Sequence, residues 1–166
     1  MAATACWVDK NQCWRRSERR KSKTRCRICW IVVRSDDAKL IAATTIPAID
    51  NDINQIELLA ARYGLSWANK KFGPSLIWLE GDSKTIVEIL NQTAHHHDDP
   101  NLIDCKIFFN IMHAFKVSHI YREGNSGADF MVNLGCAADE CTLWEDAFPA
   151  EIAISDRDKG AHYVRV

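Results

Sequence analysis

The feature that most restricts the fold of this chain is the order in which apolar strands and helices follow one another. Two extended runs around a Ser-Asp-Asp turn predict a β-hairpin, and helices then alternate with short apolar strands. The predicted elements are a weakly patterned strand at 3–8, strands at 26–34 and 38–46, a helix at 52–70, a strand at 75–80, a short helix after Ser83, a helix marked by Ile103, Ile107 and Ile111, a strand at 117–121 and a helix at 125–138. This order predicts one α/β domain, a mixed sheet covered by helices, and 166 residues are enough to bury a core.

Charge is distributed unevenly along the chain. Residues 1–34 contain ten Lys/Arg and two Asp/Glu, a net charge of +8, whereas the remaining residues carry a net charge of −9. The basic run contains Arg15, Arg16, Arg19, Arg20 and Lys21. If the protein binds nucleic acid, this run is the obvious electrostatic contributor; the alternative is a solvated, disordered charge run. We therefore predict a mobile, basic arm over residues 1–25, which includes a degenerate first strand, and a weakly patterned tail over residues 139–166.

The composition argues against a membrane-embedded or secreted protein. No stretch approaches the roughly 18 apolar residues that span a bilayer, and residues 1–8 are too short and polar for a signal peptide. Seven cysteines would leave at least one unpaired in any intramolecular set of disulfides. We therefore expect an intracellular monomer, nuclear or cytoplasmic, in a reducing compartment.

Three carboxylates lie at positions typical of a divalent-metal site. Asp82 follows the apolar run SLIWLE, Asp129 lies in the first turns of a predicted helix, and Glu57 lies beside the apolar stripe of helix 52–70. Catalytic groups of α/β folds gather at strand ends. Two-metal phosphodiester hydrolysis needs converging carboxylates, and Mg²⁺ prefers oxygen ligands. The alternatives are a helix-start charge for Asp129 and a boundary side chain that reaches solvent for Glu57.

Four segments of the chain resemble one family. They are the hairpin CRICWIVVRSDDAKLIAA, the helix NQIELLAARYGLSWA, the strand and helix SLIWLEGDSKTIVEIL, and the strand, loop and helix VSHIYREGNSGADFMVNLG. Together they resemble the RNase H-like domain of plant proteins and plant retroelement polyproteins, over residues 26–138. The resemblance implies an α/β fold, a five-stranded mixed sheet with helices on both faces.

The resemblance also implies a four-acid site that binds Mg²⁺ or Mn²⁺. Glu57, Asp82 and Asp129 match the second, third and fourth acids, and the only candidate for the first is Asp9. Asn125 matches the loop Asn before the last acid, and Ser83 follows the third acid, so both are implied to contact the substrate. The implied activity is endonucleolytic hydrolysis of the RNA strand in RNA–DNA hybrids by a metal-bound water, without a covalent intermediate.

The first strand departs from the family's pattern. Lys10 stands where the family has Gly after the first acid, and the basic run replaces a glycine-rich segment. No glycine occurs before Gly64, although the family uses several there to let the backbone approach the substrate. A second hypothesis therefore stays open, in which the domain has lost hydrolysis and acts as a nucleic-acid-binding module. A third is a protein-interaction scaffold, and a host gene and a retroelement remnant both fit the sequence.

Other clusters indicate chemistry less strongly. Cys26 and Cys29 have zinc-ligand spacing, but residues three apart in a strand face opposite sides. The run His95-His96-His97 fits a solvated loop better than a metal site. The loop before Asp129 contains no histidine, and His119, on the preceding strand, is expected to pack or to point to the sheet face.

Overall fold

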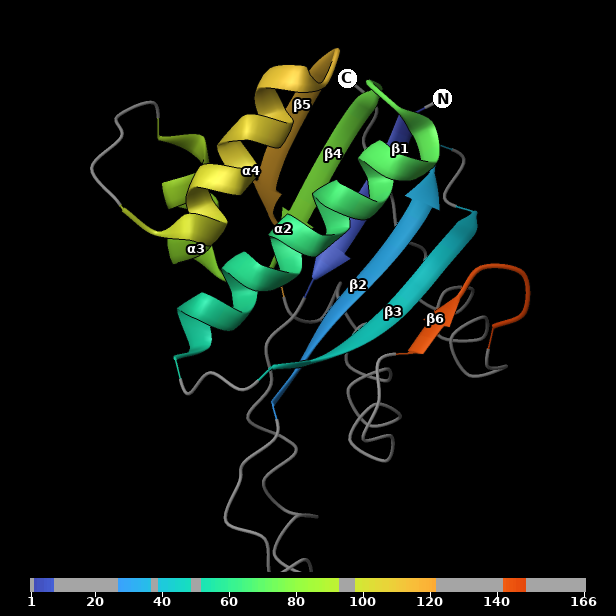
Figure 1. Ribbon diagram of the computed structural model, residues 1–166, viewed down its shortest axis with the longest axis horizontal. Coiled ribbons are helices and arrows are strands. Elements are labelled where there is room, and N and C mark those ends of the chain that lie inside the picture. Colours follow the sequence, from blue (N-terminus) through green and yellow to red (C-terminus); the bar gives the residue numbers. More distant parts are fainter. Residues whose placement is uncertain are drawn as a thin grey trace, which may run out of the picture.

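The computed structural model describes residues 2–7, 27–36, 39–48, 52–92, 98–121 and 142–148, with side chains except at 2–7, 27–30 and 47–48. Its elements (Figure 1) are β1 (Ala2–Trp7), β2 (Arg27–Ser35), β3 (Leu40–Ala48), α2 (Ile53–Phe72), β4 (Leu76–Gly81), α3 (Lys84–Asn91), α4 (Pro100–Ile111), β5 (Ala114–His119) and β6 (Thr142–Trp144). The helix predicted at 125–138 lies outside the described residues.

The strands form a mixed sheet in the order β5-β4-β1-β2-β3-β6. β2 pairs antiparallel with β1 and β3, which confirms the predicted hairpin, while β1 pairs parallel with β4 and β4 with β5. The weakly patterned first strand is therefore central to the sheet, bonded on both sides. A short strand with little hydrophobic pattern can form at this position because the strands on both sides hydrogen-bond to its main chain.

A sixth strand, β6, comes from the region that we predicted as a tail. It pairs antiparallel with β3, and the main-chain N–H of Thr142 also donates to Oγ1 of Thr45 at 3.2 Å. Just beyond β6, Glu145 forms an ion pair with Lys71 at the end of α2, with 3.0 Å between Nζ and Oε1. The described part of the C-terminal region is thus bonded to the domain.

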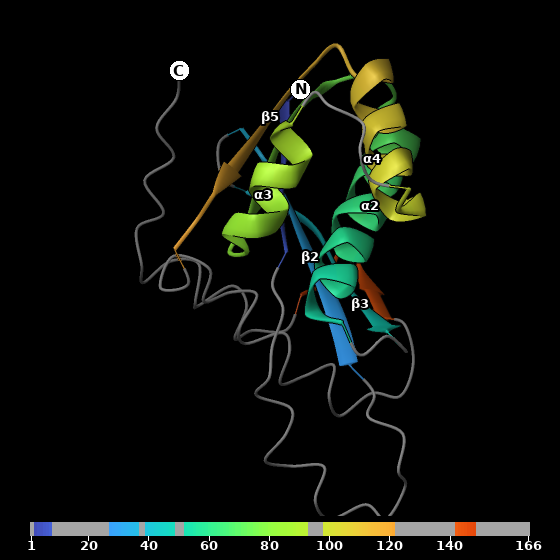
Figure 2. The ribbon, with the colours of Figure 1, turned by 90° about the vertical axis from the view of Figure 1, so that its left-hand side faces the viewer.

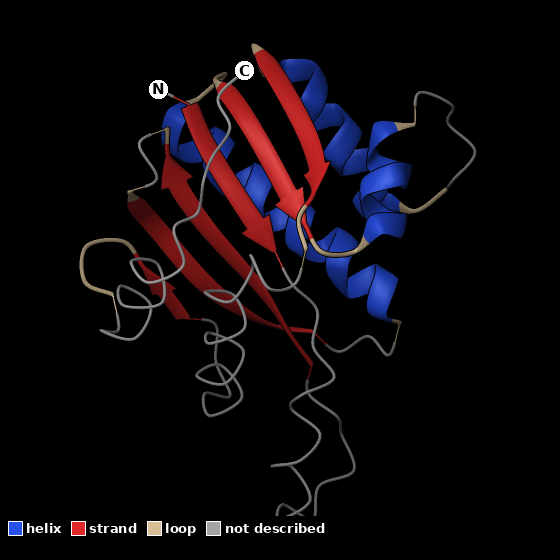
Figure 3. Cartoon of the chain, turned by 180° about the vertical axis from the view of Figure 1, so that it is seen from behind, coloured by secondary structure: helices blue, strands red, loops and turns tan. Residues whose placement is uncertain are grey.

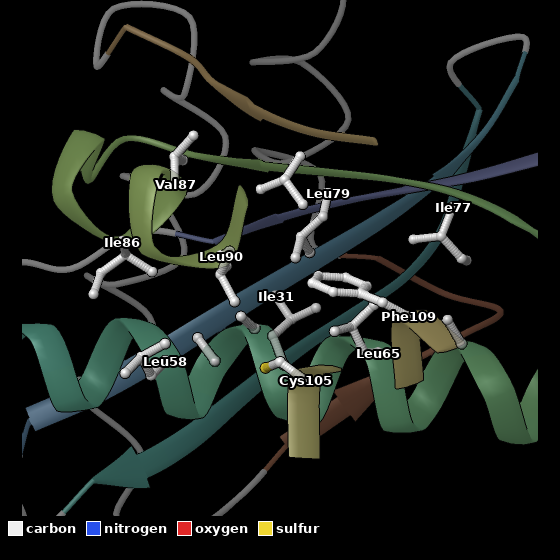
Figure 4. Close-up of a cluster of buried hydrophobic side chains, with 14 of the residues drawn as sticks. Ile31, Leu58, Leu65, Ile77, Leu79, Ile86, Val87, Leu90, Cys105 and Phe109 are labelled. Atoms are coloured by element: carbon white, nitrogen blue, oxygen red, sulfur yellow. The ribbon is translucent and has the colours of Figure 1, made fainter. Parts of the chain in front are cut away.

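The three described helices lie on one face of the sheet (Figures 2 and 3). The hydrophobic core lies between them and the sheet: Ile31 of β2 and Leu79 of β4 face Leu65 of α2, Leu90 of α3 and Phe109 of α4 (Figure 4). Fully burying a side chain of this size contributes about 1.5–3 kcal/mol. Because strands β2 to β5 and the three described helices contribute to the same core, the positions of the strand ends and of α2 are coupled through it.

Local capping signals set the helix boundaries. α2 begins after Asp52, whose Oδ1 accepts from the N–H of Asn54 at 2.9 Å. It ends at Gly73, where φ is 67°, a value that residues with a Cβ rarely adopt. Asp99 caps α4 by accepting from Asn101 and Leu102, and Pro100 takes the first helical position. α4 therefore begins directly after its capping residue.

The isoleucine stripe predicted α4 correctly but lies on its solvent side. Ile103, Ile107 and Ile111 are 47%, 53% and 43% exposed, whereas Leu102 and Cys105 lie in the core. Spacing of four residues shows that side chains share a helix face and leaves open which face is buried. Within the described residues, no helix is long and apolar enough to cross a membrane.

Candidate metal-binding site

The parallel register of three strands brings their carboxyl ends to one edge of the sheet. Trp7 of β1 lies beside Gly81 of β4, and Gly81 lies beside His119 of β5. The arrowheads of the three strands accordingly point to the same side in Figure 1. Side chains that follow these residues are placed where functional groups of α/β sheets gather.

Asp82 is the first residue beyond β4, in a bend that leads into α3. Hydrogen bonds fix the backbone on both sides of it: the N–H of Ile120 donates to the carbonyl of Gly81 at 3.0 Å, and Ser83 caps α3 by accepting from the N–H of Ile86 at 3.4 Å. The carbonyl of Asp82 itself lies 3.2 Å from Nε2 of His119. The carboxylate of Asp82 is therefore carried by a well-anchored turn.

Glu57 lies in the second turn of α2 and is 2% exposed. Its neighbours Ile56 and Leu58 are also buried, and α2 packs against β1 and β2. Figure 1 shows the N-terminal half of α2 passing over the end of the sheet to which β1 and β4 point. This burial excludes the alternative of a side chain that reaches solvent. Burying a carboxylate is costly unless other groups compensate its charge, so its presence here indicates a specific role.

The described residues contain two of the four predicted acids. Glu57 and Asp82 reach the same end of the domain from different elements, whereas Asp9 and Asp129 lie outside the described residues, as do Asn125 and the basic residues Arg15, Arg16, Arg19, Arg20 and Lys21. Within the described ranges, no group of three or more His, Cys, Asp or Glu side chains converges. The two acids present offer the oxygen donors that Mg²⁺ and Mn²⁺ prefer.

A polar cluster beside the site was missed by sequence reasoning. Glu80, 7% exposed, accepts from Oγ of Ser118 at 3.3 Å, and that hydroxyl accepts from Nε1 of Trp78 at 2.6 Å. Nζ of Lys116 lies 4.0 Å from the centroid of the Trp78 ring. These residues alternate with the core residues Ile77 and Leu79 of β4, so they lie on the opposite sheet face. The sequence signal for this cluster was Glu80 itself, an acid that alternates with apolar residues along β4.

His119 ends β5 with an exposed side chain, and its Nε2 lies 3.2 Å from the main-chain oxygen of Asp82. Its ring meets that of Tyr121 edge-on, with 5.2 Å between centroids. This contact with Asp82 forms because the parallel register places the end of β5 beside the turn after β4.

Comparison with known proteins places these features in a family. A family model described as reverse transcriptase-like matches residues 17–135. No curated protein sequence matches the chain. RNase H1 from the archaeon Halobacterium salinarum has a similar structure, with a TM-score of 0.65 and 20% identity over 84% of this chain and 100% of that chain.

Two further structures show the same likeness. The N-terminal RNase H domain of a Mycobacterium tuberculosis protein has a TM-score of 0.64 and 16% identity, covering 82% of this chain and 94% of that one. LC11-RNase H1 from compost, solved in complex with an RNA/DNA hybrid, has a TM-score of 0.63 and 14% identity, covering 80% of this chain and 94% of its own. The mixed sheet with helices packed on it thus agrees with the predicted fold. The chain belongs to the reverse transcriptase-like family and has the RNase H-like α/β fold.

Proposed function

We propose that this protein is a metal-dependent endonuclease that hydrolyses the RNA strand of RNA–DNA hybrids. The observation that carries the proposal is the placement of two carboxylates at one end of the domain. Glu57 is held there by α2, almost fully buried, and Asp82 by the turn after β4. Membership of a family with the RNase H-like fold supports the same chemistry.

Asp9 and Asp129 are proposed to complete the metal site. β1 ends at Trp7, beside Gly81, and Asp9 follows Trp7 by two residues. Two residues of extended chain span about 7 Å at most. This short separation from Trp7 supports the proposal that Asp9 belongs to the same site as Asp82. Asp129 belongs to the segment VSHIYREGNSGADFMVNLG, whose resemblance to the fourth-acid segment supports its role.

The proposed ligands are Asp9, Glu57, Asp82 and Asp129, and the proposed ions are Mg²⁺ or Mn²⁺. When bound, the ions would activate a water molecule and stabilise the charge that develops on the leaving oxygen. The chain's own contribution is to hold oxygen donors in place, with Glu57 shielded from solvent and Asp82 on an anchored turn. Ser83 and Asn125 are proposed to contact the substrate backbone.

The proposed substrate is recognised through its shape and backbone. A hybrid offers phosphates and 2′-hydroxyls rather than a sequence code, and LC11-RNase H1 is a protein of the same fold seen with such a hybrid. Arg15, Arg16, Arg19, Arg20 and Lys21 are proposed as phosphate contacts. The motif resemblance further supports a plant-type domain of host or retroelement origin, and we propose that it acts as a monomer in the nucleus or cytoplasm.

The test is cleavage of a hybrid labelled on its RNA strand, with Mg²⁺, with Mn²⁺ and with chelator. Asp82→Asn removes one ligand, and the matched control Asp146→Asn removes an exposed carboxylate beside β6, at the opposite edge of the sheet. We expect metal-dependent cleavage that Asp82→Asn lowers by about a hundredfold or more and that the control leaves unchanged. Folded wild-type protein that cleaves in neither metal would refute the proposal.

A second candidate function is binding of hybrids without hydrolysis. The observation that favours it is the altered first strand region, where Lys10 replaces Gly and the basic run replaces glycines. Such a module would bind the hybrid with an affinity that falls steeply with salt and would not cleave it. A protein that neither binds nor cleaves the hybrid would point to the third hypothesis, a protein-interaction scaffold.

A further inference from the structure

We propose that His119 is a positioning residue that orients Asp82 for metal binding, an inference that rests on the proposed function. His119 is the last residue of β5, and Asp82 is the first residue after β4. Although 37 positions separate them in the chain, Nε2 of His119 lies 3.2 Å from the main-chain oxygen of Asp82.

The chemistry of the two atoms fixes the direction of this hydrogen bond. A carbonyl oxygen can only accept, so Nε2 of His119 must carry the proton. That condition is met both by the neutral ring with its proton on Nε2 and by the doubly protonated ring. The hydrogen bond therefore forms in either charge state of the histidine.

The bond completes the anchoring of the turn that carries Asp82. The carbonyl of Gly81 accepts from Ile120, and the carbonyl of Ser83 accepts from Val87 at 3.0 Å inside α3. Between them, the carbonyl of Asp82 is held by a side chain from the neighbouring strand. Restraining this peptide group restricts the direction in which the Asp82 side chain leaves the backbone. Metal sites and active sites are sensitive to such restraint, since a misplacement of about 1 Å costs about a hundredfold in rate.

His119 is itself held in place without belonging to the core. Its ring contacts that of Tyr121 edge-on, at an angle of 83°, and the next residue, Ile120, bonds to Gly81. The side chain is exposed, so replacing it leaves the buried packing intact. A histidine with a purely structural role would affect the unfolding temperature alone, whereas a positioning residue affects metal affinity and turnover.

The experiment compares three variants of the full chain. His119→Phe removes the donor and keeps an aromatic ring against Tyr121, while His119→Gln returns an N–H group close to the position of Nε2. The matched control is His113→Phe, because His113 is exposed and lies just before the opposite end of β5. Each protein is assayed for Mn²⁺ dissociation constant by calorimetry, for kcat and KM on a hybrid, and for thermal unfolding.

We expect His119→Phe to raise the Mn²⁺ dissociation constant and to lower kcat, each about five- to tenfold, the effect of one lost hydrogen bond. KM for the hybrid should stay within about twofold, because the substrate contacts are unchanged. His119→Gln should recover most of the loss, and His113→Phe should match the wild type. Wild-type Mn²⁺ affinity and kcat in His119→Phe, or a His119→Gln variant as impaired as His119→Phe, would overturn the inference.

Failure of the proposed function is recognised separately. A wild-type protein that neither cleaves the hybrid nor binds Mn²⁺ would refute the proposed function. The NMR amide signals of Asp82 and Ser83 in the metal-free protein then test whether His119 orients the turn. If His119→Phe shifts these signals and speeds their hydrogen exchange, the histidine orients the turn; if both stay unchanged, the inference is overturned as well.

Discussion

Replacing Glu57 with glutamine separates the contribution of this carboxylate to stability from its contribution to metal binding. The side chain is 2% exposed on the sheet-facing side of α2, and glutamine has nearly the same volume. Removing the charge relieves its desolvation, while it also weakens any polar interaction that the carboxylate makes, and a hydrogen bond to a charged group typically contributes about 1.5–3 kcal/mol. Because these effects oppose each other, we expect the free energy of unfolding without metal to change by less than about 2 kcal/mol.

The effect on metal-bound protein should be larger. An ion present at a hundred times its dissociation constant stabilises the folded state by about 2.7 kcal/mol. In a domain of this size, that raises the unfolding temperature by about 5–11 °C. If Glu57→Gln weakens binding about a hundredfold, the same ion concentration contributes only about 0.4 kcal/mol, a rise of about 1–2 °C.

Thermal unfolding followed by circular dichroism, with and without Mn²⁺, measures both quantities. Glu88→Gln is the matched control, since it removes a carboxylate that is exposed on α3 and weakly paired with Lys84 at 3.8 Å. We expect Glu88→Gln to keep the full metal-dependent rise. The reasoning is wrong if Glu57→Gln keeps it too, or if Glu57→Gln without metal loses more than about 4 kcal/mol, which would make Glu57 a structural group.

Four further predictions concern the scaffold. Leu65→Ala, at a fully buried position of α2, should lower the free energy of unfolding by about 3 kcal/mol in denaturant titration, whereas Leu65→Met should cost less than about 1.5 kcal/mol. Burial raises the pKa of Cys105 from 9.0 to about 12; because the unfolded thiol ionises first, stability should fall by about 1.4 kcal/mol per pH unit between these values, and Cys105→Ala should remove that slope. Ser83→Ala should cost about 1 kcal/mol through the lost cap of α3, and Ser83→Asp should restore it. Lys106→Met, which removes two hydrogen bonds of 2.6 Å to carbonyls at the end of α3, should speed amide exchange in the last turn of that helix.

Sequence reasoning succeeded where local chemistry decides the structure. The helix predicted at 52–70 is α2, with bounds that differ by one or two residues, because a capping Asp and a Gly-Pro pair act within a few residues of the helix ends. The short helix predicted after Ser83 is α3, which begins there because Ser83 caps it. The sequence did not predict β6, because three residues are too few for a recognisable pattern and this strand is defined by its pairing with β3.

The candidate site likewise contains residues that local sequence indicates and contacts that only the fold creates. Glu57 and Asp82 were proposed as ligands from their sequence positions and from a resemblance carried by local segments, and their role as ligands stays a prediction. The bond from His119 to Asp82 and the partner of Glu80 on β5 could not be predicted, because each depends on the parallel register of β4 and β5. Contacts across that register join residues about 40 positions apart, with no local signal to pair them.

Because β1 is paired in the centre of the sheet, any effect of the altered N-terminal region on hydrolysis should come from the residues that follow β1. Replacing a glycine-rich segment with a basic run leaves β1 paired on both sides and in register with β4. A displaced first strand is therefore not the reason for any loss of activity. Among the departures from the family's pattern, Lys10 directly follows the proposed metal ligand Asp9 in the sequence. A lysine next to such an acid would repel a divalent cation and attract phosphate. This substitution is thus expected to weaken metal affinity while it strengthens hybrid affinity, so that a working enzyme would need more metal than its relatives and would release its product more slowly.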